Sequence, residues 1–243
     1  MMQHADMAGR TVVITGGAGG VGRTVSQRWL EAGASVLVVD RAQATLDQFR
    51  TALPSQMTDR LATFATDVTT EAGAAQMVVE ATRAFGSPPD TLLHLVGGFA
   101  MGPVEAPDAG QIWDRMLALN LTAPFHCYRA MLPAFRARGG GWIVGLGSRA
   151  ALQPEAKLAA YAASKAGLIA LTQSLSAEVR SAGIHVNLIL ASTIDTPANR
   201  QAMGVEHAPD WVTPDDIADA TFYLCSEQAR AVYGATLELY ANA

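Results

Sequence analysis

The sequence is poor in cysteine and in charged side chains, and both shortages limit what the chain can be. Its 243 residues include two cysteines, Cys127 and Cys225, each within an apolar helical pattern. We interpret them as two buried thiols; a disulfide would be possible but nothing supports one, and no metal-ligand spacing is present. Charged residues make up 16% of the chain against 50% hydrophobic residues. This balance predicts a sizeable core and argues against extensive disorder.

The sequence also lacks a basic run and a long apolar run. Lys and Arg are scattered, and the net charge is −5, so no nucleic-acid-binding surface is indicated. No uninterrupted apolar stretch reaches about 18 residues, so no transmembrane helix is expected. The first ten residues contain His4 and Asp6 and no apolar segment of the signal-peptide type. We therefore expect a cytoplasmic protein with no nucleic-acid or membrane partner.

Short β-branched runs alternate with longer segments of helical periodicity along the whole chain. Strands are expected near residues 11–14, 35–39, 61–65, 91–96, 142–146, 184–190 and 235–239. Helices are expected over about 21–32, 70–85, 110–138, 161–181 and 215–226. The alternation predicts an α/β fold, with a parallel sheet and helices on both faces. No linker divides residues 1–243, so one domain is expected, and the least periodic segment, 197–210, is a candidate lid over a ligand site.

A glycine-rich turn follows the first expected strand and opens the first expected helix. It runs from Thr15 through Gly16 and Gly20 to Val21 and Gly22. Backbone amides at a helix N-terminus suit a pyrophosphate, and glycines let phosphates approach the backbone closely. A flexible turn would also use glycines. The order of strand, turn and helix favours dinucleotide binding.

Acidic residues end the next two strands. Asp40 lies eighteen residues after Gly22, where a carboxylate can accept hydrogen bonds from the adenosine ribose. That carboxylate would repel a 2′-phosphate, so NAD(H) is favoured; the Arg41 guanidinium could hold such a phosphate, so NADP(H) is possible. Asp67, followed by Val68, could hold the adenine amino group or cap the next helix, and both interpretations stay open.

Tyr161 and Lys165 stand four residues apart, with Ser148 thirteen and Asn120 forty-one residues before the tyrosine. Positions i and i+4 share one face of a helix. An ammonium beside a phenol is expected to lower the phenol pKa toward working pH, which suits proton exchange with a carbonyl or an alcohol. Alone, the pair would be interpreted as a surface contact.

The whole set resembles the short-chain dehydrogenase/reductase family. The matching features span nearly the whole chain in the family's order: Thr15-Gly-x-x-x-Gly20-x-Gly22, Asp40, Asp67, Asn120, Ser148, Tyr161-x-x-x-Lys165 and Val186-Asn187. The resemblance implies a single doubly wound, Rossmann-like domain with about seven parallel strands. It also implies an NAD(P)-dependent enzyme that interconverts a secondary alcohol and a ketone or other carbonyl.

The resemblance assigns a role to each matching residue. Tyr161 would be the general acid in reduction and the general base in oxidation, while Lys165 would lower the tyrosine pKa and hold the nicotinamide ribose. Ser148 would hydrogen-bond the substrate oxygen. Asn120 would hold a water that extends a proton relay from Lys165. The cofactor contacts implied on the nicotinamide side are Gly97, Ile194, Thr196, Tyr161 and Lys165.

The segment after the fourth strand departs from the family's Asn-Asn-Ala-Gly. Here it is His94-Leu95-Val96-Gly97. We expect His94 to be a buried neutral ring that hydrogen-bonds in place of an asparagine. The Leu95 side chain carries no amide group. A water or another side chain is therefore expected to satisfy the backbone groups that an asparagine would bind. The lid is shorter than is usual, and the candidate pocket walls are Phe99, Met101, Leu152, Pro154 and Met203.

Two alternatives remain open at this stage. One is an NADPH-dependent 3-oxoacyl-thioester reductase, which would need a basic entrance built from Arg136, Arg138, Arg149 and Arg200. The other is a non-catalytic dinucleotide-binding sensor or scaffold. The surplus of apolar residues on segments 110–138 and 161–181 predicts a homo-oligomer, and in the family these helices pair in dimers and tetramers.

Overall fold

A computed structural model describes residues 7–242 of the chain. Residues 1–6 and residue 243 lie outside the described part. The expectation that the first ten residues are not a signal peptide therefore falls partly outside it. Within residues 7–242 the strands form one sheet in the order β3-β2-β1-β4-β5-β6-β7, and every pair is parallel. The strands are β1 (Thr11–Thr15), β2 (Ser35–Asp40), β3 (Leu61–Ala65), β4 (Thr91–His94), β5 (Gly141–Ser148), β6 (Ile184–Ala191) and β7 (Thr236–Leu239). The predicted parallel sheet of about seven strands is confirmed.

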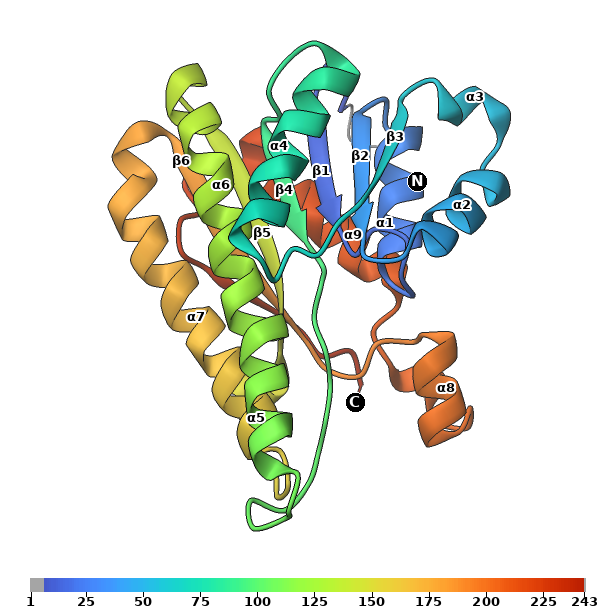
Figure 1. The fold of residues 1–243 in the computed structure, drawn as a ribbon, viewed down its shortest axis with the longest axis vertical. Coiled ribbons are helices and arrows are strands. Elements are labelled where there is room, and N and C mark those ends of the chain that lie inside the picture. The colour runs from blue at the N-terminus through green and yellow to red at the C-terminus, as the bar shows by residue number, and fades with distance from the viewer. Residues whose placement is uncertain (1–6, 243) are drawn as a thin grey trace.

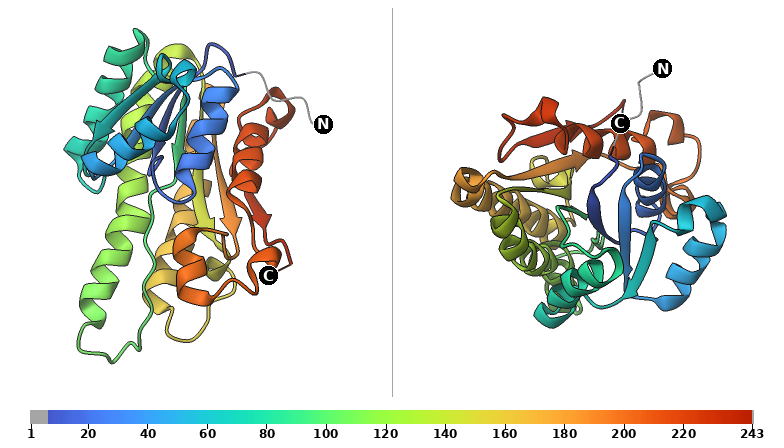
Figure 2. Two further views of the ribbon diagram at one scale, coloured as in Figure 1. Left: turned by 90° about the vertical axis from the view of Figure 1, so that its right-hand side faces the viewer. Right: turned by 90° about the horizontal axis from the view of Figure 1, so that it is seen from above.

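Helices cover both faces of the sheet (Figures 1 and 2). One face carries α4 (Glu71–Phe85), α6 (Ala123–Arg138) and α7 (Ala159–Val179), with Tyr128 and Phe135 in its core. The other carries α1 (Gly22–Glu31), α2 (Gln43–Ala52) and α9 (Pro214–Leu224), where the Trp29 and Phe222 rings stack 5.0 Å apart. Since β1, β2 and β6 are buried along nearly their whole length, their apolar runs are explained by cover on both faces.

The expected helix over 110–138 is three segments in the structure. These are α5 (Ala109–Leu117), a π-helical turn (Ala118–Thr122) and α6, with Pro124 in the first turn of α6 and Pro133 inside it. The i, i+5 turn changes the rotation of the chain around Asn120. Helical periodicity indicated the whole segment but could not reveal the wider turn.

Three short helices differ from the sequence-based expectation. α2 and α3 (Ser55–Thr58) lie between β2 and β3, where no helix was predicted. The lid candidate 197–210 contains α8 (Pro197–Met203) and a 3₁₀ turn (Ala208–Asp210). Thr196 caps α8, and Pro197 occupies its first turn, where proline is favoured. The segment therefore begins as an ordered helix.

The two cysteines are buried and unpaired, as predicted, and burial raises the pKa of each thiol to about 12. Across residues 7–242, no helix combines the length and apolar character that crossing a membrane requires.

Candidate active site

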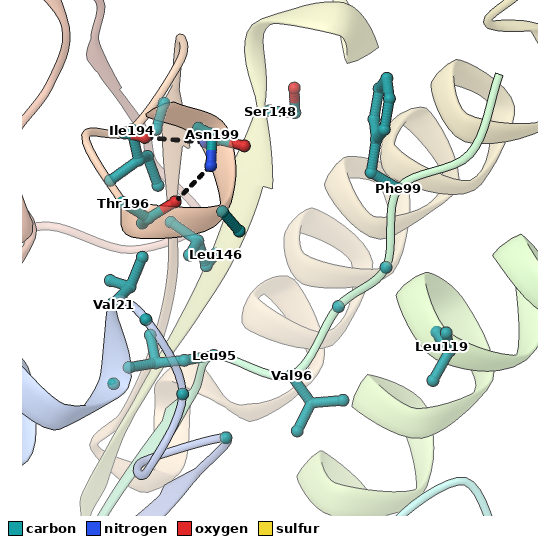
Figure 3. Close-up of a pocket in the computed structure, with 18 of the residues that line it drawn as sticks. Val21, Leu95, Val96, Phe99, Leu119, Leu146, Ser148, Ile194, Thr196 and Asn199 are labelled. Carbon is teal, nitrogen blue, oxygen red and sulfur yellow. Dashed lines mark hydrogen bonds between the residues drawn. The ribbon is translucent and has the colours of Figure 1, made fainter. Parts of the chain in front are cut away.

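A cavity of about 1090 Å³ opens at the carboxyl ends of the strands. It lies at the point where the sheet order reverses between β1 and β4, the usual ligand position in open α/β sheets. Figure 3 looks into it, with Val21 and Leu95 near the glycine loop and Ser148 and Phe99 at the opposite end. The predicted site residues that line it are Gly16, Gly20, Val21, Gly22, Asp40, Arg41, Asp67, Val68, Gly97, Ser148, Tyr161, Lys165, Ile194 and Thr196.

Thr15 and Asn120 are the predicted site residues that do not line the cavity. Both are fully buried, and each supports a wall from behind. The sequence correctly placed them at the end of the sheet where the cavity opens. It could not distinguish residues that face the cavity from buried residues that support its wall.

The glycine loop has the shape of a phosphate cradle. Gly16 has φ +67°, in the left-handed region that favours glycine. At Gly22 an added Cβ would lie 2.0 Å from the Gly16 carbonyl oxygen, so the loop and α1 approach too closely for any side chain. No described side chain caps the N-terminus of α1, which starts after Val21. The open amides and the narrow turn fit a pyrophosphate.

Two carboxylates lie at the adenosine end of the cavity. An oxygen of Asp40 accepts the Arg41 backbone N–H at 2.7 Å. The hydroxyl and the amide of Thr69 both donate to Asp67 and, with the Arg41 charge as a weaker cause, hold its pKa below the usual range. The helix-cap interpretation of Asp67 is wrong, because Thr70 caps α4 by accepting the Gly73 N–H at 3.0 Å. The Asp67 carboxylate instead closes a turn to Thr69.

His94 is buried and makes a side-chain hydrogen bond, as predicted. Its Nδ1 lies 2.9 Å from the Thr15 hydroxyl, joining β4 to the start of the glycine loop. Burial, and secondarily the Lys165 charge, lowers its pKa to about 3, so the ring is neutral at physiological pH. The Leu95 N–H donates to the Thr15 carbonyl at 3.0 Å. A water or side-chain partner for the backbone groups that an asparagine side chain would bind stays a prediction.

The Asn120 side-chain amide links the π-helical turn to the segment after β4 and to α7. Its Oδ1 accepts the Gly98 N–H at 2.9 Å, and its Nδ2 donates to the Gly98 carbonyl and to the Ser164 hydroxyl, each at 3.0 Å. The π-helical turn places this amide inside the protein. The residue therefore fixes the wall after β4 against α7, beside Lys165.

Tyr161 and Lys165 reach the cavity from the first two turns of α7. The Lys165 Nζ donates to the Leu146 carbonyl at 2.8 Å, and burial lowers its pKa to about 8. Burial raises the pKa of the Tyr161 phenol, and the Ser148 hydroxyl partly opposes this rise. The expectation that the ammonium lowers the phenol pKa is therefore wrong for this structure. Desolvation is the largest cause of the shift, and the Lys165 ammonium donates to the Leu146 carbonyl.

The far wall is built by the segment after β6. Thr196 accepts the Asn199 N–H at 3.2 Å, and the Asn199 side chain donates to the Ile194 carbonyl at 2.8 Å (Figure 3). Asn199 thus holds Thr196 and Ile194 in place. Sequence reasoning missed Asn199, and the one signal for it was the turn-forming pair Thr196-Pro197. Of the predicted pocket walls, Phe99 and Met203 line the cavity, whereas Met101, Leu152 and Pro154 do not.

Metal chemistry was not expected from the sequence. In the part of the chain that the structure describes, no group of three or more His, Cys, Asp or Glu residues is placed to hold a metal ion.

Comparisons with known proteins agree with this geometry. Residues 10–205 match the family model described as short chain dehydrogenase. The chain is 31% identical to 2-(S)-hydroxypropyl-CoM dehydrogenase 3 of Xanthobacter autotrophicus over 92% of each chain. It is also 31% identical to 3beta-hydroxysteroid dehydrogenase 2 of Eggerthella lenta over 96% of this chain and 94% of the other.

A solved structure has the same fold. The 3-ketoacyl-(acyl-carrier-protein) reductase of Brucella melitensis, complexed with NADH, superposes with a TM-score of 0.85 at 27% identity. The match covers 96% of this chain and 98% of the other. The chain therefore belongs to the short chain dehydrogenase family, and it is an oxidoreductase that acts on CH–OH groups.

Proposed function

We propose that the protein interconverts a secondary alcohol and a ketone with Tyr161 as the proton-transfer group, using NAD(H) in preference to NADP(H). The observation that carries the proposal is the convergence of Ser148, Tyr161 and Lys165 on one cavity with the glycine cradle. When bound, the nicotinamide supplies or accepts the hydride. The residues of the chain bind it, orient the substrate and move the proton.

The roles of the catalytic residues follow from their surroundings. The Tyr161 phenol would donate its proton to the carbonyl oxygen during reduction and accept it from the alcohol during oxidation. Burial raises its pKa and so weakens it as an acid, and the Ser148 hydroxyl opposes that rise. The Ser148 hydroxyl, beside the phenol, would bind the same oxygen and stabilise charge developing there. Lys165 would hold the nicotinamide ribose, and Asn120 would fix the wall against which the ring lies.

The preference for NAD(H) rests on Asp40. Its carboxylate lines the cavity where the adenosine ribose would lie, and a 2′-phosphate there would meet a like charge. Arg41, the competing recognition group, is exposed and close enough to Asp67 to lower the pKa of that carboxyl. A ribose with two free hydroxyls would meet no like charge at Asp40.

The thioester-reductase alternative gains little from its four candidate arginines. Arg200 pairs with Asp195 at 2.6 Å, Arg138 lies 3.7 Å from Asp90, and Arg136 lies 4.0 Å from Glu178. The Arg149 guanidinium lies over the Tyr240 ring, 5.7 Å from its centroid. A basic entrance for an acidic carrier protein would need cations that are not already paired.

We also propose that the protein is a cytoplasmic homo-oligomer, a dimer or a tetramer. Trp113 on α5 and Phe125 on α6 are exposed, on the helices that pair with a second subunit in the family. Burying such side chains would stabilise an interface. A monomer in multi-angle light scattering would contradict this.

The direct test is a panel of ketones, aldehydes and alcohols followed by NADH and NADPH absorbance, with both dissociation constants measured. We expect turnover with at least one ketone–alcohol pair and tighter binding of NADH. Tighter NADPH binding would refute the argument from Asp40. Absence of turnover across the panel, with NADH bound, would favour a sensor or scaffold.

A further inference from the structure

Exposed apolar side chains are carried by three segments at the carboxyl ends of the strands, and two of them, Phe99 and Met203, line the cavity. They come from the segments after β4, β5 and β6, which are far apart in the sequence: Phe99, Met101, Val104, Leu152, Met203 and Val205. Each is at least 51% exposed, with Val104 at 71%. Exposed apolar groups gathered at one end of a protein are typical of a binding surface rather than of ordinary surface variation.

Each of these segments follows the carboxyl end of its strand, and two of them are in direct contact. The Gly102 N–H donates to the Lys157 carbonyl at 2.9 Å, which joins the segment after β4 to the one after β5. The segment after β4 and α8 both lie beyond the sheet at its lower end in Figure 1. Phe99 and Met203 line the cavity itself, so these two members of the group belong to the site.

Phe99 is the member closest to the chemistry. Its ring meets the Tyr161 ring edge to face, with centroids 5.0 Å apart, yet Phe99 is 57% exposed. The Arg115 side chain donates to the Phe99 carbonyl at 3.4 Å and helps to hold the segment there. A ring that touches the proton-transfer tyrosine and still faces solvent has an open side on which another apolar group can pack.

The charges at this end do not favour an anion. Among the described cavity-lining residues here, the cations are Lys165, which donates to the Leu146 carbonyl, and Arg149, which lies over Tyr240. The Glu155 carboxylate also lines the cavity and would repel a negative substrate. Because both cations already contact other groups of the protein, the lining favours an uncharged, apolar substrate.

We infer that the substrate is an uncharged ketone or secondary alcohol with an apolar aryl or alicyclic substituent, which packs on Phe99 and reaches toward Met203. The inference rests on the proposed function, because it places the reacting oxygen at Tyr161 and Ser148. Phe99 is then the specificity-determining residue for the larger substituent.

Three ketones test the inference: acetone, acetophenone and 4-acetylbenzoate, the last two differing mainly in charge. With the wild-type enzyme and NADH, acetophenone should exceed 4-acetylbenzoate in kcat/KM by about tenfold or more. Phe99→Ala should lower kcat/KM for acetophenone by about tenfold more than it lowers kcat/KM for acetone. Val79→Ala, an exposed apolar truncation on α4 away from the cavity, is the matched control and should change neither.

Two kinetic outcomes would overturn the inference: preference for 4-acetylbenzoate, or equal losses for acetone and acetophenone in Phe99→Ala. A change in sedimentation of Phe99→Ala would also overturn it, because the apolar group would then be a subunit interface. If no ketone is reduced, the proposed function fails separately. Ligand-detected NMR of acetophenone and 4-acetylbenzoate with the NADH-bound protein then decides the inference, which requires acetophenone to bind more tightly and Phe99→Ala to weaken it.

Discussion

Lys165→Met should abolish the catalytic contribution of the lysine while changing stability in a pH-dependent way. Burial lowers the pKa of this lysine from 10.5 to about 8, which corresponds to about 3 kcal/mol against the folded state when the group is charged in both states. Below pH 8 the full penalty acts. Between pH 8 and 10.5 the unfolded chain binds the proton that the folded protein has lost, so wild-type stability rises with pH.

The methionine variant has no ionisable group at position 165, so it avoids the cost of burying a charge. It also loses the hydrogen bond that Lys165 makes. The Leu146 carbonyl would be left without its Lys165 donor, which costs about 1–3 kcal/mol at every pH. At pH 7 the two effects nearly cancel, and the variant should be between equally stable and about 2 kcal/mol more stable than wild type. Between pH 7 and pH 10 the unfolding free energy of the variant should fall by about 2–3 kcal/mol relative to that of wild type.

Urea unfolding at both pH values, with the same protein concentration, measures this change. Lys157→Met is the matched control, since Lys157 is the other lysine of the chain and is exposed. Its difference from wild type gives the baseline against which the Lys165→Met difference is compared at each pH. A Lys165→Met difference that changes with pH no more than this baseline would refute the assignment of a desolvated, weakly basic lysine at this position.

Three further predictions concern the walls of the cavity. His94→Asn should reduce acid sensitivity. Between pH 7 and pH 5 the unfolded wild-type chain binds a proton at a ring of ordinary pKa 6.5, whereas the folded ring, with a pKa of about 3, stays neutral. Wild type should therefore lose about 2 kcal/mol of unfolding free energy over this range by urea unfolding, and the variant should lose less. Gly22→Ala should weaken NADH binding at least about tenfold by calorimetry, because its Cβ would overlap the Gly16 carbonyl; unchanged binding would contradict the phosphate cradle. Asp40→Ser should bring the NADPH dissociation constant closer to that of NADH by about tenfold, since a like charge is removed; an unaltered ratio would contradict the role of Asp40.

The fold and the composition of the site were largely predictable from the sequence. Buried parallel strands are continuous apolar runs, so β1, β2 and β6 stand out directly. The carboxyl ends of parallel strands meet at one edge, which brings Asp40, Asp67 and Ser148 to one cavity although they are distant in sequence. Those placements depend on strand direction alone.

What was not predictable depends on side-chain direction and local competition. The i, i+4 spacing placed Tyr161 and Lys165 on one face of α7, but the available carbonyl of Leu146 decides where the ammonium points. Helical periodicity also cannot distinguish an α-turn from the π-turn that turns Asn120 inward. The capping of α8 by Thr196, with Asn199 bonded to Ile194, is likewise a local arrangement that the irregular pattern of 197–210 concealed.

The measurement that tests the central claim most directly is a single-turnover reduction by the NADH-bound protein, comparing wild type with Tyr161→Phe. Acetophenone and the other ketones of the panel serve as substrates, and NADH affinity is measured in parallel. The account predicts that the variant binds NADH with a dissociation constant within about threefold of wild type, because the cradle at Gly16 and Gly22 is untouched. It predicts a rate of hydride transfer lower by about 100-fold or more, because the proton donor is gone. A rate near that of wild type would contradict the assignment of Tyr161 as the general acid.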